Sequence, residues 1–390
     1  MHDFILREIK NSDIETELKK IGFDRLYTHK AKEKFEYKNI KIYSLTPAMA
    51  NIIKQTALSV GCDCATHREV ITGKIENSNC ILGGSLSQIK KVAEKLKYQP
   101  FDLKKLGEEI LQTLPQVKRE RRVFTGEGGQ TRLVGILNIT PNSFSDGGIY
   151  NDFEKAKKHL LELIEDGADI IDIGAESTKP YSQAVPTTEQ LKKLLPIIDF
   201  AKGKIPLSID TRCAEVAEEC LKAGANIIND VSGFDYDENM VNVIAKYNIP
   251  IIIQHSKGTP ENMQNSPAYA DLMEEIFLNL RKKIDFAHSK GIENIIIDPG
   301  IGFGKSRENN FEIIRRVEEF QSLGCPIMLG ISRKSLLDMA DADNLTKDIY
   351  TAALNALAIE KNIDYIRVHN VKMHRKLIDL MDMFMVELSD

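Results

Sequence analysis

Polar residues end a series of short apolar segments in the later two-thirds of the sequence. They are Asn138, Glu176 with Ser177 and Thr178, Asp210, Asn229, Gln254 with His255, Asp298, Arg333 with Lys334, and Arg367 with His369. A single Asp or Asn in such a place is most often a helix N-cap or a loop hydrogen bond. A polar residue after each of eight successive segments instead indicates a shared site.

The chemistry of these side chains divides into two kinds. Asp210, Asn229 and Asp298 offer acceptors and amide groups that suit a planar heterocycle with several N–H and C=O edges. Arg367 and His369 suit phosphate oxygens. The division predicts a bipartite ligand, in which a fused nitrogen ring carries a phosphate group.

The elements that must position these residues are short β-branched runs separated by amphipathic helical stretches. The predicted strands are residues 132–139, 168–174, 205–210, 225–230, 249–255, 293–298, 326–332 and 364–369. Eight such units match the roughly 250 residues of a (β/α)8 barrel, whose strands all end at one mouth. A doubly wound open sheet is the less favoured alternative, because residues 135–148 lack the GxGxxG fingerprint.

The sequence divides into two domains and a linker. Residues 115–131 are basic, then Gly-rich, and lack periodicity over most of their length, which indicates a linker. Residues 132–390 form the predicted barrel, and residues 1–114 an α+β accessory domain of unknown role. In the accessory domain we expect a strand at 39–45 and helices at 48–61 and 85–96.

Composition restricts the class of partner and the location. The 390 residues are 42% hydrophobic, and 52 basic against 57 acidic residues give a net charge of -5. This charge gives no general attraction for nucleic acid or an anionic membrane, so a small-molecule substrate is expected. The charged N-terminal residues contain no signal peptide or membrane span, and six scattered cysteines indicate reduced thiols, so we expect a cytoplasmic protein.

Seven motifs resemble, in the same order, the signatures of the dihydropteroate synthase family. They are GILNITPNSFSDGG, DIGAESTKP, SIDT, IIND, DPGIGFGK, GISRKS and IRVHNVK. The resemblance covers essentially the whole predicted barrel, about two-thirds of the chain. The N-terminal domain resembles extensions found on only some members.

The resemblance implies an Mg2+-assisted transfer of the 7,8-dihydropterin-6-ylmethyl group from its diphosphate to the amine of p-aminobenzoate. We expect a dissociative route without a general base, because the positive charge on the methylene can spread into the pterin ring and the arylamine is neutral at pH 7. The resemblance implies a homodimer that associates through barrel helices. It also assigns roles to individual residues: Asp210, Asn229, Asp298 and Lys334 to the pterin; Asn138 to Mg2+ and, with Thr178, Arg367 and His369, to the diphosphate; and Phe144 and Pro180 to the ring of p-aminobenzoate. We further expect the p-aminobenzoate carboxylate near Ser335 and the N-terminus of the following helix, where backbone N–H groups favour an anion. Phe303 is expected at the rim of the pterin site. Asp210, Lys334 and Arg367 are the expected catalytic residues.

The sequence departs from the usual family pattern at a few positions. Asn142 and Asn370 stand where Asp is common, Lys179 where Arg is common, and Tyr181 where a small residue is usual. Ala175 stands where Gly is common. These departures affect the p-aminobenzoate loops more than the pterin pocket and leave sulfonamide sensitivity open.

Three local motifs admit a second interpretation. GIGFGKS is not a P-loop, since three residues rather than four separate Gly300 from Gly304. The grouping of Cys62, Cys64, His67 and Cys80 lacks a standard zinc spacing, so buried small side chains are favoured over a metal site. His255 is interpreted as a wall of the pterin site rather than a metal ligand.

Two other functions remain open from the sequence. One is a related pterin-binding barrel that transfers a methyl group from a folate to a corrinoid protein. The other is a catalytically inactive scaffold whose N-terminal domain carries the function. The motifs GISRKS and IRVH, which suit a diphosphate, and the FSDGG loop favour the synthase over the methyltransferase. The scaffold is disfavoured because all the expected ligand-binding residues are present: Asn138, Asp210, Asn229, Asp298, Lys334, Arg367 and His369.

Overall fold

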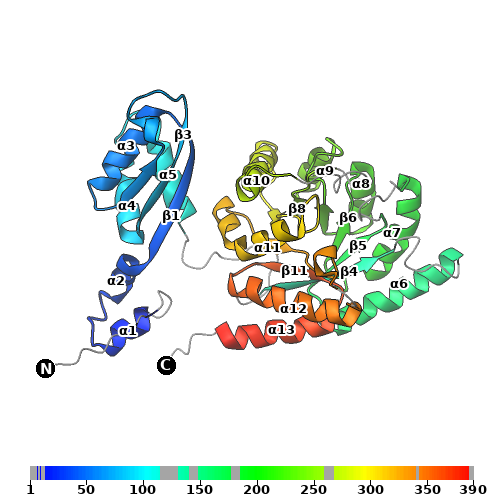
Figure 1. Ribbon diagram of the computed structural model, residues 1–390. Helices are drawn as coiled ribbons and strands as arrows, with labels where there is room; N and C mark the ends of the chain where they lie inside the picture. Colours follow the sequence, from blue (N-terminus) through cyan, green and yellow to red (C-terminus); the bar gives the residue numbers. More distant parts are fainter. Residues whose placement is uncertain are drawn as a thin grey trace. The chain divides into compact units, whose positions relative to one another are not determined.

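The computed structural model describes residues 7, 9, 14–114, 131–139, 148–176, 185–258, 268–339 and 342–385. The chain separates into two compact units, Met1–Arg119 and Glu120–Asp390 (Figure 1). Each unit has its own hydrophobic core. They are therefore described separately.

The N-terminal unit combines a small antiparallel sheet with helices. Its elements are α1 (Ile14–Lys20), α2 (Thr28–Phe35), β1 (Tyr37–Leu45), α3 (Pro47–Leu58), β2 (Asp63–Thr66), the 3-10 turn η2 (Arg68–Val70), β3 (Ser78–Ser85), α4 (Leu86–Leu96) and α5 (Leu103–Thr113). The sheet order is β1-β3-β2. Cys62, Cys64 and Cys80 are buried in the core beside this sheet.

Two of these strands, β2 and β3, were not predicted from the sequence. β2 has only four residues, and β3 ends in Gly83, Gly84 and Ser85, a sequence typical of a loop. The glycines allow close packing: a Cβ on Gly84 would lie 2.6 Å from Cys62 Sγ, and one on Gly83 would lie 2.7 Å from the Tyr37 hydroxyl. Glycine in these strand positions therefore reflects a neighbouring side chain rather than a turn.

The second unit is a (β/α)8 barrel of parallel strands with helices outside (Figure 1). Its strands are β4 (Arg132–Asn138), β5 (Ile170–Gly174), β6 (Leu207–Asp210), β7 (Ile227–Asp230), β8 (Ile251–Gln254), β9 (Ile295–Asp298), β10 (Met328–Leu329) and β11 (Tyr365–Val368). Its helices are α6 (Gly148–Glu165), α7 (Thr187–Ala201), α8 (Ala214–Ala223), α9 (Met240–Tyr247), α10 (Leu272–Ser289), α11 (Arg307–Arg315), α12 (Asn344–Glu360) and α13 (Val371–Met385), with 3-10 segments η3 (Val317–Leu323) and η4 (Ser335–Leu337). A parallel bridge between Ile297 and Ile327 closes the ring between β9 and β10.

Two apolar layers hold the barrel together. One fills the space between the strands and the outer helices. The other is a separate cluster of strand residues: Val134, Ile170, Ile227, Ile252, Ile296, Met328 and Tyr365. Because strand side chains alternate between two faces, this second cluster fills the barrel interior and leaves the strand ends for polar groups.

The strand before the GISRKS motif is shorter than predicted. The sequence predicts residues 326–332, but β10 covers only Met328–Leu329. Beyond it the chain turns, and Arg333 has a φ of 56°, in the left-handed region. The apolar pattern continues through Ile331 because that side chain is buried, although its backbone has left the sheet.

None of the helices in the described parts of the chain is long and apolar enough to cross a membrane.

Candidate active site

Strand register places the predicted polar residues side by side at the mouth of the barrel. Asn138 pairs with Gly174, Gly174 with Asp210, and Asp210 with Asn229. Further round the ring, Gln254 pairs with Asp298. The carboxyl ends of these strands therefore carry their side chains at one level, as the sequence predicts.

One carboxylate, Asp172 of β5, joins two of the predicted residues. Its Oδ2 accepts hydrogen bonds from Arg367 Nε at 2.6 Å and from Asn229 Nδ2 at 3.0 Å. Arg367 also donates from Nη2 to Asp210 Oδ2 at 2.9 Å. Asp172 is fully buried, so this arrangement is fixed before any ligand binds.

Three buried oxygens of this network have no hydrogen-bond partner among the described residues. They are Asp172 Oδ1, Asp210 Oδ1 and Asn229 Oδ1, on the adjacent strands β5, β6 and β7. An unsatisfied buried acceptor costs roughly 1–3 kcal/mol. Three together predict a ligand that supplies several N–H donors.

Burial changes the charge of the groups in this mouth. It raises the pKa of Asp210 to about 7, although the positive charge of Arg367 acts in the opposite direction. Burial also raises the pKa of Asp298, against the charge of Lys334. For Lys334 burial lowers the pKa to about 8. The site therefore contains groups that exchange protons near neutral pH, which is typical of active sites.

One wall of the mouth is formed by Asp298, Phe303 and Lys334. Lys334 Nζ donates to the Ile301 carbonyl at 2.5 Å and lies 4.6 Å from the centre of the Phe303 ring. A Cβ built on Gly330 would lie 3.6 Å from Lys334 Nζ and 4.0 Å from Asp298 Oδ2, which places these two groups above the same glycine. A cation, a carboxylate and an aromatic ring thus converge at one side of the mouth.

A buried lysine holds the loop that follows β9. Lys305 Nζ donates to the carbonyls of Gly300 at 2.8 Å and Phe303 at 3.0 Å, and lies 3.0 Å from His255 Nδ1. Burial lowers the pKa of His255 to about 2, so its ring is neutral and Nδ1 accepts from Lys305. His255 therefore fastens this loop, a role that the sequence interpretation did not include. A Cβ on Gly300, whose φ is 73°, would overlap the His255 carbonyl oxygen.

The remaining predicted residues lie at the edge of the mouth. His369 Nδ1 is 3.0 Å from Ser332 Oγ. Ser335 is exposed and begins η4, a single 3-10 turn rather than the longer helix expected there, since α12 begins only at Asn344. A pocket of about 350 Å³ opens beside Ser335, with Lys305, Ser306 and Arg307 among its lining residues.

Asn138 ends β4 with an exposed side chain. A Cβ on Gly174 would lie 3.6 Å from Asn138 Oδ1 and 3.7 Å from Asp210 Oδ2, so both oxygens face the same part of the mouth. The described residues contain no group of three or more His, Cys, Asp or Glu that could hold a metal ion. Phe144, Thr178 and Pro180, as well as Asn142, Lys179 and Tyr181, lie outside the described residues.

Comparison with known proteins matches this barrel to one family. The model of the pterin binding enzymes matches residues 134–369. Dihydropteroate synthase from Clostridium beijerinckii is 45% identical over 250 residues, which cover 63% of this chain and 90% of that protein. The chain belongs to the dihydropteroate synthase family. It is therefore a transferase of the pterin-binding class.

A longer match reaches into the N-terminal unit. A probable bifunctional folylpolyglutamate synthase/dihydropteroate synthase from Halobacterium salinarum is 37% identical over 330 residues, which cover 83% of this chain and 40% of that protein. This match is longer than the barrel unit, so the N-terminal unit is partly shared with that dihydropteroate synthase relative. The chain spans less than half of the relative's length.

Solved structures of the dihydropteroate synthase family have the same barrel. The Yersinia pestis enzyme, in complex with a sulfonamide drug, is 32% identical with a TM-score of 0.64, covering 68% of this chain and 98% of that chain. The Clostridium difficile enzyme, in the presence of pteroic acid, is 38% identical with a TM-score of 0.63, covering 67% of this chain and all of that chain.

Two residues of this dihydropteroate synthase barrel were missed from the sequence. Asp172 lies inside the apolar run ADIIDIG, and a carboxylate in the interior of a buried strand was the available signal. Lys305 follows the GIGFG segment and was considered only as part of a P-loop. Both are buried and bonded to residues of the mouth.

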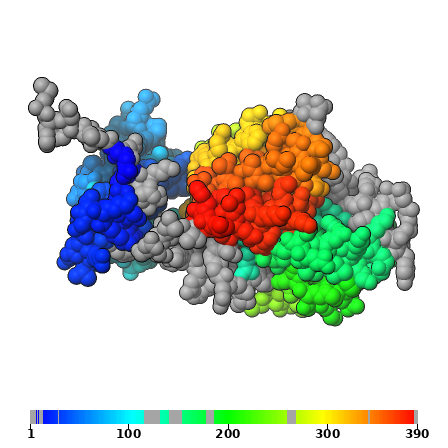
Figure 2. Space-filling model, turned by 90° about the horizontal axis from the view of Figure 1, so that it is seen from below, coloured from blue at the N-terminus to red at the C-terminus, as the bar shows by residue number. Residues whose placement is uncertain are grey.

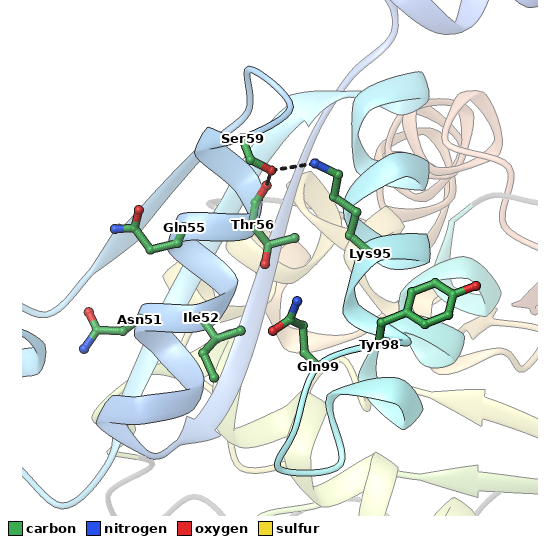
Figure 3. A pocket seen from close by; sticks show the side chains of 8 residues that line it. All are labelled: Asn51, Ile52, Gln55, Thr56, Ser59, Lys95, Tyr98 and Gln99. Atoms are coloured by element: carbon green, nitrogen blue, oxygen red, sulfur yellow. Dashed lines mark hydrogen bonds between the residues drawn. The ribbon is translucent and has the colours of Figure 1, made fainter.

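A larger pocket, of about 550 Å³, lies in the N-terminal unit between α3 and the end of α4 (Figure 3). Asn51, Gln55 and Tyr98 are among its lining residues, and Lys95 Nζ donates to Ser59 Oγ at 2.8 Å. No buried polar atom without a partner faces it among the described residues. The candidate active site of this dihydropteroate synthase family member is therefore the barrel mouth.

Proposed function

We propose that the barrel mouth condenses 7,8-dihydropterin-6-ylmethyl diphosphate with p-aminobenzoate to give 7,8-dihydropteroate and diphosphate. The three buried acceptors without partners, Asp172 Oδ1, Asp210 Oδ1 and Asn229 Oδ1, carry this proposal. A pterin presents N–H groups along the edge of a flat ring, which is the pattern that these oxygens require. The relatives named dihydropteroate synthase support the same substrates.

The pterin ring would lie between two groups of residues. One is the acceptor floor, formed by Asp172, Asp210 and Asn229, and the other is the wall formed by Asp298, Phe303 and Lys334. Asp172 fixes Asn229 by accepting from its Nδ2, and this leaves the amide oxygen to accept from the ring. Asp298 accepts from the Gly300 backbone N–H at 2.7 Å through Oδ1. Lys334 would bind the ring from the side of Phe303. These contacts orient the ring without a covalent bond to the protein.

The reaction follows from the charges that this site can stabilise. The bond between the pterin methylene carbon and the diphosphate oxygen breaks first, and the electron pair leaves with diphosphate. The positive charge that remains spreads into the ring, where the carboxylates of Asp210 and Asp298 stabilise it. The amine of p-aminobenzoate then forms the new C–N bond and loses a proton. This amine is neutral at pH 7, so no general base is required.

We propose that Arg367 and His369 hold the diphosphate and that Asn138 holds Mg2+. Asn138 fits this role because it offers an exposed amide oxygen, and Mg2+ commonly takes one or two protein oxygens together with water and phosphate oxygens. When bound, the ion would neutralise charge on the leaving diphosphate. Arg367 is fixed by two carboxylates, Asp172 and Asp210, so it needs no rearrangement when the ligand arrives.

The carboxylate of p-aminobenzoate would bind near Ser335. The pocket beside Ser335 includes Ser306 and Arg307 at the start of α11. Backbone N–H groups at a helix start favour an anion. By the family resemblance, Phe144, Thr178 and Pro180 would complete the site.

Replacement of Lys334 separates an enzyme from an inactive scaffold. In a coupled assay for diphosphate release, Lys334→Ala should lose most turnover while the protein stays folded, and EDTA should abolish turnover of the unchanged chain. Equal rates for Lys334→Ala and the unchanged chain would contradict the proposed site.

We propose that residues 1–114 form an α+β accessory domain joined by the linker 115–131 to the barrel. Its core, which includes Ile53, Leu82 and Ile89, is separate from that of the barrel. A chain that begins at residue 115 should therefore stay soluble and keep its turnover. Loss of folding in that chain would show that the barrel needs the N-terminal domain.

We also propose a homodimer that forms through α12 and α13. These helices lie side by side on one face of the barrel, shown in orange and red in Figure 2. They expose large apolar side chains: Leu345, Ile349 and Leu357 on α12, and Leu380, Met383 and Phe384 on α13. Such a concentration on neighbouring helices is typical of a protein interface. We place this dimer in the cytoplasm, where the thiols of its six cysteines would stay reduced.

A further inference from the structure

A bidentate ion pair holds the segment that follows β10. Arg333 donates from Nε to Asp348 Oδ1 and from Nη2 to Asp348 Oδ2, both at 2.8 Å. Asp348 lies in the first turns of α12, and its side chain is only 3% exposed. Arg333 has a left-handed backbone conformation, which costs free energy in a residue with a side chain. The two hydrogen bonds to the buried Asp348 carboxylate offset that cost.

The same carboxylate also holds the segment that follows β11. Asn370 Nδ2 donates to Asp348 Oδ2 at 3.0 Å, while Asn370 Oδ1 accepts from the Met373 backbone N–H at 3.1 Å. Ser332 and His369 make a second connection between the two segments. Asp348 thus connects α12 both to the segment that follows β10 and to the segment that follows β11.

We propose that Asp348 is a positioning residue for the groups that bind p-aminobenzoate and diphosphate. Through Arg333 it places Ser335, beside which the p-aminobenzoate carboxylate would bind. Through Asn370 it places His369, which would hold the diphosphate. This inference rests on the proposed function, because it assigns the two segments to these substrates.

The ion pair also accounts for an amide at residue 370, where the family commonly has Asp. A carboxylate at this position would face Asp348 Oδ2, which already accepts from Arg333. Two carboxylates in direct contact would repel each other, because the Asp348 side chain is shielded from solvent. In this chain the negative charge comes from α12, and residue 370 supplies the N–H donor instead.

The acceptor floor of the pterin site does not depend on this connection. Asp172, Asp210 and Asn229 are held by one another and by Arg367. Lys334 has its own bond to the Ile301 carbonyl. Loss of the Asp348 charge should therefore affect p-aminobenzoate more than the pterin.

The test compares Asp348→Asn with the double variant Asp348→Asn/Asn370→Asp in the full-length chain. The double variant moves the carboxylate across the hydrogen bond that joins residues 348 and 370, and keeps one negative charge in this pair of residues. Asp348→Asn should raise the KM for p-aminobenzoate about tenfold, since a displaced loop misplaces the bound substrate. The Kd of a pterin without diphosphate should change less than about twofold. The double variant should recover most of the KM.

Turnover of the unchanged chain separates this inference from the proposed function. If the unchanged chain makes dihydropteroate and Asp348→Asn has an unaltered KM for p-aminobenzoate, the positioning role is wrong. Equal losses for p-aminobenzoate and pterin, without recovery in the double variant, would also overturn it. If Asp348→Asn does not fold, the double variant decides: a folded protein with a near-normal KM supports the inference, and an unfolded one or a raised KM contradicts it.

Discussion

In the floor of the site, the buried carboxylate of Asp172 fixes the orientation of two neighbouring side chains. Asp172 accepts from both Arg367 and Asn229, and these bonds orient a guanidinium and an amide that would otherwise rotate. Its second oxygen has no hydrogen-bond partner among the described residues and can accept from the proposed ligand. A substitution at Asp172 should therefore change the geometry of the whole proposed pterin site.

Asp172→Asn should raise the Kd of a pterin about a hundredfold. The new amide can still accept from Arg367 or Asn229, but its NH2 group would face the ligand where an acceptor is needed, and such mismatches discriminate strongly. Isothermal titration calorimetry measures the Kd. Asp169→Asn is the matched control, because Asp169 just precedes the same strand and pairs with Arg375 outside the mouth. A similar Kd for the two variants would refute the role of Asp172.

Pterin affinity should increase with pH through about 7. Asp210 has its pKa raised to about 7 mainly by burial, so it is largely protonated at pH 6 and largely ionised at pH 8. A ligand N–H requires the carboxylate, which predicts about a tenfold lower Kd at pH 8 than at pH 6 and proton release on binding. Calorimetry in buffers of different protonation enthalpy, with a pterin that lacks phosphate, measures both quantities. An Asp210→Asn variant with the same pH dependence would contradict this origin.

The raised pKa also affects stability. The native protein binds more protons at Asp210 than the unfolded chain does between pH 3.8, the ordinary pKa, and about 7. The contribution of Asp210 to the free energy of unfolding therefore falls as pH rises through that window.

Strand register and the anchoring of loops have different physical origins. The eight strands could be predicted because their β-branched runs and polar ends repeat, and strand pairing then brings Asp210, Asn229 and Asp298 to the mouth. The anchoring of loops depends on contacts distant in sequence, such as Lys305 with His255. No local pattern reports such a contact, and this is why Lys305 was missed.

Lys305→Met should lower the free energy of unfolding of the barrel by about 3 kcal/mol. The substitution leaves the carbonyls of Gly300 and Phe303 without their donor in a buried place. Urea denaturation, followed through the barrel transition, measures the change. Lys158→Met, on α6, is the control, because its exposed pair with Glu162 should contribute less than about 1 kcal/mol. Equal effects of the two substitutions would show that the loop is held by other contacts.

For the whole molecule, sequence pattern predicted the barrel better than the N-terminal unit. Repetition of one unit eight times makes a barrel recognisable, whereas β2 and β3 are short and rich in small residues. The exposed residues of α12 and α13 illustrate a second limit, because helical periodicity does not say which apolar residues stay uncovered. Both features depend on how distant parts of the chain pack.

Met383→Glu with Phe384→Glu should convert the proposed dimer into a monomer. These side chains are 77% and 72% exposed at the end of α13, so in a dimer their replacement would bury two charges. Sedimentation velocity at micromolar protein measures the change. Leu278→Glu, on α10 and 43% exposed, should leave the dimer intact. A monomeric unchanged chain would contradict the proposed interface.

The proposed condensation can be measured as product formation. The full-length chain is mixed with 7,8-dihydropterin-6-ylmethyl diphosphate, p-aminobenzoate and Mg2+, and dihydropteroate and diphosphate are measured together. We expect one diphosphate for each dihydropteroate formed. Two results would contradict the proposed condensation. One is tight binding of the pterin diphosphate without any product, and the other is methyl transfer from a folate to an added corrinoid protein.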